Sequence, residues 1–241
     1  GVDDARHGLE PVDAIENHGL IFVTQDAPIG RGALEGLDEI PDLLTPDQSI
    51  FSSNETTSNV NWKLNMEANL EGLHIKTTHP ESFFPYGYDN LTILESFGNN
   101  SRVTFPFRRI EKLRGTPVEA RNVAGQLTYV YHLFPNVAIA VLSNHTSVTI
   151  SEPLTTTSTR FITYRMTNSG EETSEANLTR AKRDAGFLAD TGSQEDAAAV
   201  RAIQEGLTSG ANKHFTFGHY EKSIVHFHQT LTRTLERLPT D

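Results

Sequence analysis

Six short segments rich in β-branched and aromatic residues follow one another between positions 90 and 165. Turn residues separate them, as at Gly98-Asn99-Asn100 and Pro135-Asn136. Consecutive strands joined by short turns pair in antiparallel fashion, because each reversal brings the next strand alongside the last. We therefore expect one antiparallel meander, built from the segments LTILESF, SRVTFPFRRI, GQLTYVYHLF, NVAIAVLSN, TSVTISEPL and TRFITYRM.

Helical patterns flank the strand region on both sides. Before it, good helix formers predict a helix from about 62 to 75, and Pro80 prevents any continuation. After it, we expect helices over 171–188, over 193–207 and in the terminal stretch 219–238. The apolar stripe of the terminal helix is formed by Tyr220, Ile224, Phe227, Leu231, Leu235 and Leu238. Strands flanked by helices in this way predict an α+β fold, with the helices on one face of the sheet.

The first sixty residues carry weaker signals. Residues 19–25, GLIFVTQ, are typical of a buried strand, whereas residues 26–60 are rich in Pro, Gly, Asp and Ser and predict loops with short elements. Residues 1–20 lack the basic start and the apolar core of a signal peptide. No apolar run is long enough to span a membrane. We therefore expect a cytoplasmic protein without a membrane partner.

Composition excludes several kinds of site. The chain contains no cysteine, which excludes disulfides, thiolate metal sites and any iron–sulfur cluster held by this chain. Its net charge of −11 argues against a nucleic-acid partner, because binding a phosphate backbone requires a basic surface. The 241 residues are enough for one large domain with a substantial core.

The stretch EGLHIKTTHPESF, at 71–83, places one carboxylate and two imidazoles close together. On the expected helix Glu67, Glu71 and His74 share one face, since each residue advances about 100°. His79 lies about 140° from His74 on a regular helix, so the helix has to end between them before both can bind one ion. A metal site, a buried polar cluster and a chance arrangement are all compatible with this pair. A third ligand would have to come from elsewhere in the chain.

Asp196 is the candidate third ligand. It belongs to a helical stripe that we expect to face the core, formed with Ala197, Val200, Ile203 and Leu207. A carboxylate on that stripe needs a partner, because burying an unpaired charge is costly. Glu195 and Glu205 are expected to point elsewhere. The alternative is a capping box with Ser193, in which Asp196 only stabilises the helix N-terminus. Two histidines and one carboxylate would form the facial triad of non-haem Fe(II) oxygenases.

Taken in order, these motifs resemble the catalytic domain of the Rieske non-haem iron oxygenases. That family comprises the α subunits of ring-hydroxylating dioxygenases and the related monooxygenases and demethylases. The central match is the run Asn61-Trp62-Lys63, followed by Glu67, Glu71, His74 and His79-Pro80. Further matches extend over almost all of the chain, at 19–23, 133–136, 195–196, 203–207, Glu221 and 226–228.

The resemblance implies a fold, a metal and a reaction. The fold is the helix-grip (START-like) fold, a curved antiparallel sheet packed on a long C-terminal helix. The metal is a mononuclear Fe(II) held by His74, His79 and Asp196. The reaction is the O2-dependent hydroxylation of an organic substrate, for which we favour an aromatic compound. Oxidative N- or O-demethylation is the alternative within the family. A non-enzymatic START-like ligand-binding module and a zinc hydrolase are the alternatives outside it.

The resemblance also implies partners. Family members carry an N-terminal Rieske domain whose 2Fe–2S cluster is held by two Cys and two His. Residues 1–241 are therefore expected to be the catalytic domain alone, with the cluster on a missing domain or a partner. Electrons would come from the Rieske domain of a neighbouring subunit and a reductase or ferredoxin, in a homotrimer or an α–β oligomer. Glu71 matches the acidic bridge between cluster and iron, with an ordinary surface glutamate as the alternative.

Two positions depart from the family pattern, and several others are candidates for a substrate pocket. Leu73 and Ala68 stand where Tyr and Asn are frequent in the family. An apolar pocket lining is predicted for Phe83, Phe84, Tyr86 and the strands at 127–150, with core packing as the alternative. Glu67 is left out of the catalytic set. No ligand spacing connects the triad to His132, His145, His214, His219, His226 or His228.

Overall fold

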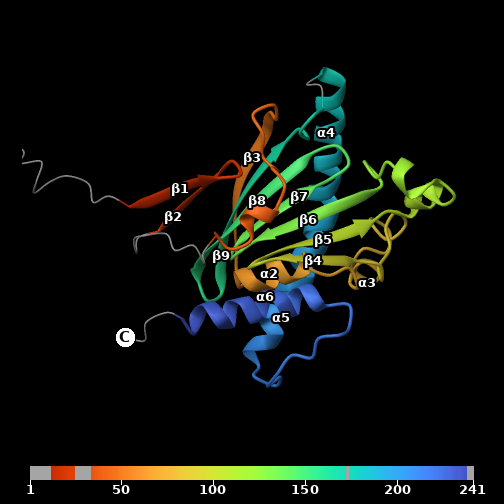
Figure 1. The fold of residues 1–241 in the computed structure, drawn as a ribbon. Helices are drawn as coiled ribbons and strands as arrows, with labels where there is room; N and C mark the ends of the chain where they lie inside the picture. The colour runs from red at the N-terminus through yellow and green to blue at the C-terminus, as the bar shows by residue number, and fades with distance from the viewer. Residues whose placement is uncertain (1–11, 25–33, 172–173, 238–241) are drawn as a thin grey trace, which may run out of the picture.

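The structure is a computed structural model that describes residues 12–24, 34–171 and 174–237. Its main feature is a seven-stranded antiparallel sheet in the order β3-β9-β8-β7-β6-β5-β4 (Figure 1). The strands are β3 (Ile50–Ser58), β4 (Ile93–Phe97), β5 (Asn100–Pro106), β6 (Leu127–Leu133), β7 (Val137–Val141), β8 (Thr146–Thr155) and β9 (Ser158–Met166). The six predicted strands are thus confirmed, and each of the first five pairs with the strand that follows it in sequence.

The strand β3 was not predicted. It pairs with β9, so that Asn54 lies opposite Thr163, and it forms one edge of the sheet. The prediction of loops with only short elements over 26–60 is therefore wrong for Ile50–Ser58, which form a regular strand. The polar sequence FSSNETTS has no apolar alternation, and its pairing with a strand a hundred residues later is a tertiary effect that local pattern does not carry. Residues 26–33 of that stretch lie outside the described residues.

A separate hairpin precedes the sheet, made of β1 (Asp13–Asn17) and β2 (Leu20–Thr24). It confirms the predicted strand at 19–25, of which residue 25 lies outside the described residues. The prediction that this strand is buried is right for one face only. Leu20 and Phe22 pack against the core of the sheet, whereas Ile21 is 73% exposed and Val23 is 60% exposed. The two strands pair only with each other among the described residues, so no third strand covers them.

The helices are α2 (Trp62–Ala68), α3 (Ile75–Thr78), α4 (Glu175–Phe187), α5 (Ser193–Thr208) and α6 (Lys222–Leu235). A π-helical segment, Leu188–Gly192, joins α4 to α5. Short 3-10 segments occur at Leu37–Glu39, Arg108–Leu113 and Val118–Ala120. The helices predicted near 171–188, 193–207 and 219–238 are confirmed with shifted ends, while residues 172–173 and 238 lie outside the described residues. In the described ranges no helix combines the length and apolar character needed to cross a membrane.

The helix predicted from 62 to 75 is wrong beyond Ala68. Asn69 is the C-cap residue of α2, and its side-chain Nδ2 donates a hydrogen bond to the Asn65 carbonyl at 2.8 Å. A new helical turn, α3, begins only at Ile75. Glu67, Glu71 and His74 therefore do not share one helical face, and any contact between Glu71 and His74 has to arise from the connecting loop.

Both faces of the sheet are covered. One face packs against residues 34–44 in a core cluster formed by Leu37, Ile40, Leu43, Tyr131, Leu133, Ile139, Val148 and Met166. On the other face, α2 and α6 meet the sheet in a cluster formed by Met66, Leu70, Val103, Ile224 and Phe227. The C-terminal helix thus packs on the antiparallel sheet, which confirms the α+β, helix-grip fold. Tyr220 and Leu235 are exposed, so the predicted stripe of α6 is buried only in its middle.

Candidate metal centre

His74 and His79 flank the single turn of α3. His74 is the N-cap residue of that turn and His79 is its C-cap residue. Their ring centroids lie 5.2 Å apart. The helix predicted up to residue 75 ends at Ala68 and is followed by a loop and the single turn of α3. This arrangement brings together two rings that a regular helix would hold apart.

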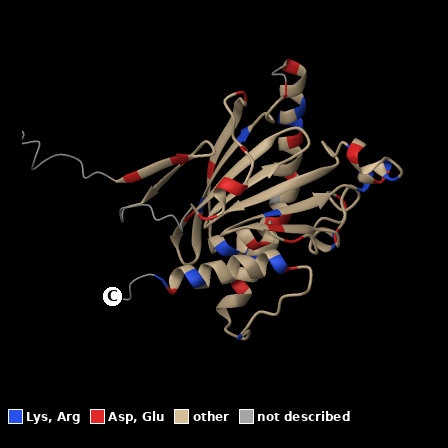
Figure 2. Cartoon of the chain, viewed as in Figure 1, with Lys and Arg blue, Asp and Glu red and all other residues tan. Residues whose placement is uncertain are grey.

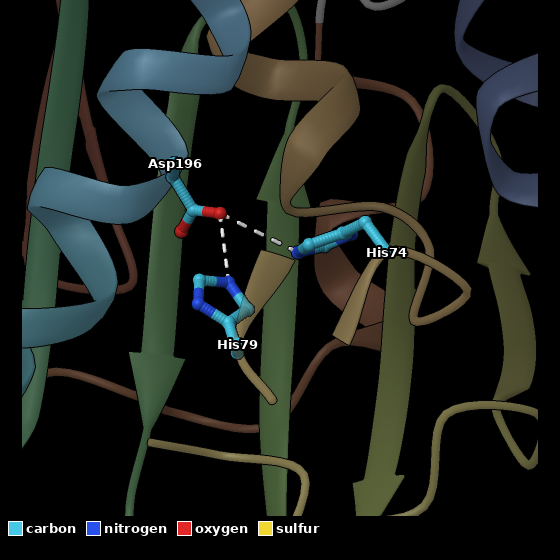
Figure 3. Close-up of side chains that lie close together, drawn as sticks. All are labelled: His74, His79 and Asp196. Carbon is cyan, nitrogen blue, oxygen red and sulfur yellow. Dashed lines mark ion pairs between the residues drawn. The ribbon is translucent and has the colours of Figure 1, made fainter. Parts of the chain in front are cut away.

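Asp196 reaches the two histidines from the first turn of α5 (Figure 3). Its Oδ1 atom lies 2.8 Å from Nε2 of His79 and 3.5 Å from Nε2 of His74. Each of the three residues offers one ligand atom, and these atoms all lie within 4.8 Å of one another. The structure therefore brings together the three residues that the sequence singles out. The capping-box alternative for Asp196 is wrong, because Gly192 is the N-cap residue and α5 has no side-chain cap.

The elements that carry these residues are tied to one another. Asn61 caps α2 by accepting a hydrogen bond from the Lys63 backbone N–H at 3.0 Å. Its own backbone N–H donates to the side chain of Gln204, on α5, at 2.8 Å. The Asn61 side chain also donates to the Thr156 carbonyl, in the turn after β8, at 2.7 Å. The start of α2 is thereby fixed to α5, which carries Asp196, and to the sheet.

Glu71 orients the ring of His74. One of its carboxylate oxygens is hydrogen-bonded to Nδ1 of His74. The other accepts from the backbone N–H groups of Leu73 and His74, the latter at 3.2 Å. Glu71 is buried, so the surface-glutamate alternative is wrong. When Nδ1 carries the proton that Glu71 accepts, the lone pair of His74 lies on Nε2, the atom directed at Asp196.

Glu195 orients the ring of His79, and this contact was not predicted. Its Oε2 atom lies 2.6 Å from Nδ1 of His79 and accepts a hydrogen bond from Ser82 Oγ, also at 2.6 Å. The two hydrogen bonds, from His79 and then from Ser82, lower the pKa of the Glu195 carboxyl. The expectation that Glu195 points elsewhere is wrong. The ring of His79 lies beside the start of α5, so consecutive residues of that helix reach opposite nitrogens of the ring.

The two carboxylates favour the protonated form of the His79 ring. Burial alone lowers the pKa of this ring, but hydrogen bonds to Asp196 and Glu195 and their negative charge outweigh that effect, so the pKa is raised. In both histidines, then, Nδ1 faces a carboxylate and Nε2 faces Asp196. Metal-ligating histidines are typically oriented in this way, with the second ring nitrogen donating to a carboxylate.

Aromatic packing holds the His79 ring in place. The ring centroid of Phe83 lies 4.7 Å from that of His79 and 5.8 Å from that of Phe187. Gly192, the last residue of the π-helical segment, makes this packing possible. A Cβ atom at Gly192 would lie only 2.2 Å from Cζ of Phe83. π-helical segments often occur at functional sites, and here one ends beside the histidine cluster.

A cavity of about 1290 Å³ adjoins the cluster, between the sheet and α4 and α5. Phe83 and Tyr86 line it as predicted, whereas Phe84 does not and packs instead beneath the side chains of Lys76 and Arg108. The sheet contributes a wall of mixed character from the predicted strands, formed by Thr128, Val130, Ala138, Ala140, Ser147 and Thr149. The prediction of an apolar wall is therefore only partly right.

The remaining polar candidates lie outside the cluster. Glu67 Oε1 lies 2.9 Å from Nε2 of His228, which links α2 to α6. His145 pairs with Asp184 on α4, at 3.1 Å. In the ranges that the structure describes, His74, His79 and Asp196 are the one group of three such residues close enough to share a metal ion.

Comparison with known proteins agrees with this geometry. A family model described as ring hydroxylating alpha subunit (catalytic domain) matches residues 47–237. This range contains all three residues of the cluster and the whole of the seven-stranded sheet. No curated protein gives a significant match.

Several solved structures have the same fold. A quaternary ammonium Rieske monooxygenase is 17% identical with a TM-score of 0.71, over 96% of this chain and 66% of that one. Naphthalene 1,2-dioxygenase from Rhodococcus sp. bound to indole is 13% identical with a TM-score of 0.67, over 94% of this chain and 67% of that one. Dicamba monooxygenase is 13% identical with a TM-score of 0.58, over 95% of this chain and 71% of that one. The chain thus spans about two thirds of the length of these similar structures.

Proposed function

The chain belongs to the family of ring-hydroxylating alpha-subunit catalytic domains, and on that premise we propose that it binds one Fe(II) and hydroxylates an organic substrate with O2. The ligands are Nε2 of His74, Nε2 of His79 and a carboxylate oxygen of Asp196. One observation carries the proposal. The three ligand atoms lie within 4.8 Å of one another, and each imidazole has its other nitrogen on a carboxylate.

The donor set fits iron. Two imidazoles and one carboxylate on one side of an ion are the ligands of non-haem Fe(II) oxygenases. Bound Fe(II) would supply the activation of O2, at coordination positions that these three residues leave open. Neither thiolates nor a fourth His, Asp or Glu in the described residues would compete for those positions.

The neighbouring residues orient the ligands. Glu71 and Glu195 accept the Nδ1 protons, which keeps both Nε2 atoms available to the ion. Phe83 packs against His79 and restricts rotation of that ring. The adjacent cavity receives the substrate, and its lining includes His74, His79 and Asp196. A substrate held there has its reacting carbon within reach of the ion.

The reaction requires an external reductant. Inserting one oxygen atom of O2 into a C–H bond and reducing the other to water consumes two electrons and two protons. We assign their supply to a Rieske domain, carried by a neighbouring subunit, and to a reductase or ferredoxin. Glu71 would couple that cluster to the iron, because it already contacts His74 through Nδ1. We propose that the protein acts in the cytoplasm as part of a homotrimer or an α–β oligomer. The alternative reaction at the same site is N- or O-demethylation.

Metal analysis tests the proposal. After anaerobic loading with Fe(II) and removal of excess metal, we expect about one iron per chain and no acid-labile sulfide. Asp196→Ala should lose most of that iron while its circular dichroism and melting temperature stay close to those of the unchanged protein. Glu205→Ala is the matched control, because Glu205 is an exposed carboxylate on the same helix. A protein that binds no iron would be a ligand-binding module, and strong selectivity for zinc would favour a hydrolase.

A further inference from the structure

The cavity extends along β9 away from the histidine cluster. Phe161 lies at the α5 end, where it packs against the core cluster of Val60, Leu64 and Val200. Thr163 and Arg165 follow on the same face of the strand and also line the cavity. Because an antiparallel strand rises about 3.4 Å per residue, Arg165 lies roughly 14 Å along β9 from Phe161. The cavity therefore has a metal end beside α5 and a second end at Arg165.

Arg165 has no acidic partner among the residues that the structure describes. Its Nη1 atom donates a hydrogen bond to Asn54 Oδ1 at 3.0 Å, from the neighbouring strand β3. In the described parts of the chain no carboxylate lies within ion-pair distance of its guanidinium. Its side chain is only partly exposed, and burial lowers its pKa. A partly buried charge without a counter-ion is costly unless a ligand supplies one.

The rest of the lining is also basic. Five arginines line the cavity, namely Arg109, Arg165, Arg180, Arg183 and Arg201. Three acids line it, and two of them, Glu71 and Asp196, belong to the histidine cluster. The third, Asp184, is paired with His145. Figure 2 shows basic positions on α4 together with acidic ones. The lining thus carries more arginines than acids, and among the five arginines only Arg165 is half-buried, whereas the other four are exposed.

Two buried polar atoms on the cavity wall have no hydrogen-bond partner among the described residues. They are Nε2 of His145 and Oγ of Ser151. Both residues are almost completely buried, at 0% and 1% exposure. Asp184 holds the other nitrogen of His145 and so fixes the ring. A buried polar atom left unpaired costs free energy, so these atoms point to a ligand that carries polar groups.

We propose that the substrate is an organic carboxylate whose carboxylate group binds Arg165, with His145 as a second polar contact. The proposal rests on the proposed oxygenase function and names the substrate class of the same cavity. A guanidinium binds a carboxylate through two parallel hydrogen bonds, which fixes orientation as well as position. With its carboxylate at Arg165, a substrate that fills the cavity places its far end beside His74, His79 and Asp196. A permanently cationic substrate is disfavoured by the same arginines.

Binding to the metal-free protein tests this proposal, because a carboxylate then has no ion to ligate. The probes are two matched pairs, benzoate with benzamide and hexanoate with hexanamide, together with phenyltrimethylammonium. We expect at least one carboxylate to bind tenfold or more tightly than its amide by isothermal titration calorimetry. In Arg165→Gln that preference should fall to about twofold while amide binding stays unchanged, and Arg165→Lys should be intermediate.

Arg160→Gln is the matched control. Arg160 lies on the same strand β9 but on the opposite face, where it pairs with Glu152 at 2.6 Å. This variant removes one positive charge from the protein and should keep the full preference for carboxylates. The proposal is overturned if neither carboxylate binds more tightly than its amide, if phenyltrimethylammonium binds more tightly than both carboxylates, or if Arg165→Gln keeps the preference.

Iron content separates this proposal from the proposed function. A protein that binds iron but shows no carboxylate preference remains an oxygenase candidate and contradicts only the substrate class. A protein that prefers carboxylates through Arg165 but binds no iron is an anion-binding module. In that case the carboxylate site stands and the oxygenase function fails.

Discussion

Nδ1 of His79 lies 2.6 Å from Oε2 of Glu195. The residue that follows Glu195 in the chain, Asp196, approaches the other nitrogen of the same ring at 2.8 Å. Two consecutive acids at the start of α5 thus act on opposite sides of one imidazole. One of them is the proposed ligand and the other orients the ring. This division of roles leads to the first prediction.

Glu195→Gln should weaken iron binding about 10- to 100-fold without unfolding the protein. Loss of a carboxylate behind a metal-ligating histidine typically costs that much affinity, because the ring is less firmly held and less basic. Competitive titration of Fe(II) against a chelator measures the change. Glu205→Gln, on the exposed side of the same helix, should leave the affinity unchanged. Equal affinity in the Glu195 variant would mean that this contact plays no part in metal binding.

Iron affinity should fall as the pH is lowered. Without metal, hydrogen bonds to Asp196 and Glu195 and their charge outweigh burial and raise the pKa of His79, so the ring keeps its proton to higher pH than usual. The ion has to displace the Nε2 proton, so binding is weakened at every pH below that raised pKa. Calorimetry in buffers of different ionisation enthalpy should detect proton release that increases as the pH is lowered. Proton release that does not change with pH would contradict the raised pKa of His79.

The antiparallel meander could be predicted from the sequence because each of its strands carries its own apolar pattern and turn residues. The strand β3 could not, since its polar sequence gains its structure from pairing with β9. The end of α2 at Ala68 also escaped prediction, because the Asn69 cap depends on one side-chain hydrogen bond. Residue spacing and the family resemblance were enough to identify the proposed ligands His74, His79 and Asp196. The contact between Glu195 and His79 depends on how the loop after α3 packs against α5. Spacing along the sequence does not predict that packing.

Gly192→Ala should destabilise the protein by about 1–3 kcal/mol and disturb the His79 ring. The added Cβ would lie 2.2 Å from Cζ of Phe83, and overpacking of a close contact typically has that cost. Urea unfolding of the metal-free protein measures the change. Phe83→Ala removes the clash, so the double variant should be more stable than the sum of the two single effects predicts. Simple additivity would show that the two residues do not interact.

His132 should make the protein less stable in acid. Its side chain is completely buried, and burial lowers its pKa to about 4 from the usual 6.5. Below pH 6.5 the unfolded chain takes up a proton that the folded chain does not, so stability is full above pH 6.5 and falls as the pH drops towards 4. The loss from this one group is up to about 3 kcal/mol.

The comparison that isolates this effect uses His132→Gln. Urea unfolding of the metal-free variant should show a weaker loss of stability between pH 7 and pH 4 than the unchanged protein shows. His214→Gln, which alters an exposed histidine, should show the same loss as the unchanged protein. If all three proteins lose the same free energy over this range, His132 is not the neutral buried group described here.

The most direct test of the metal centre is an anomalous-difference map at the iron edge, from crystals grown anaerobically with Fe(II). We predict one strong peak, about 2.0–2.2 Å from Nε2 of His74, Nε2 of His79 and a carboxylate oxygen of Asp196, as in comparable sites with these donors. Nδ1 of the two histidines should remain on Glu71 and Glu195. An iron peak bound elsewhere, or a fully loaded crystal in which Asp196 does not contact the ion, would contradict the assignment.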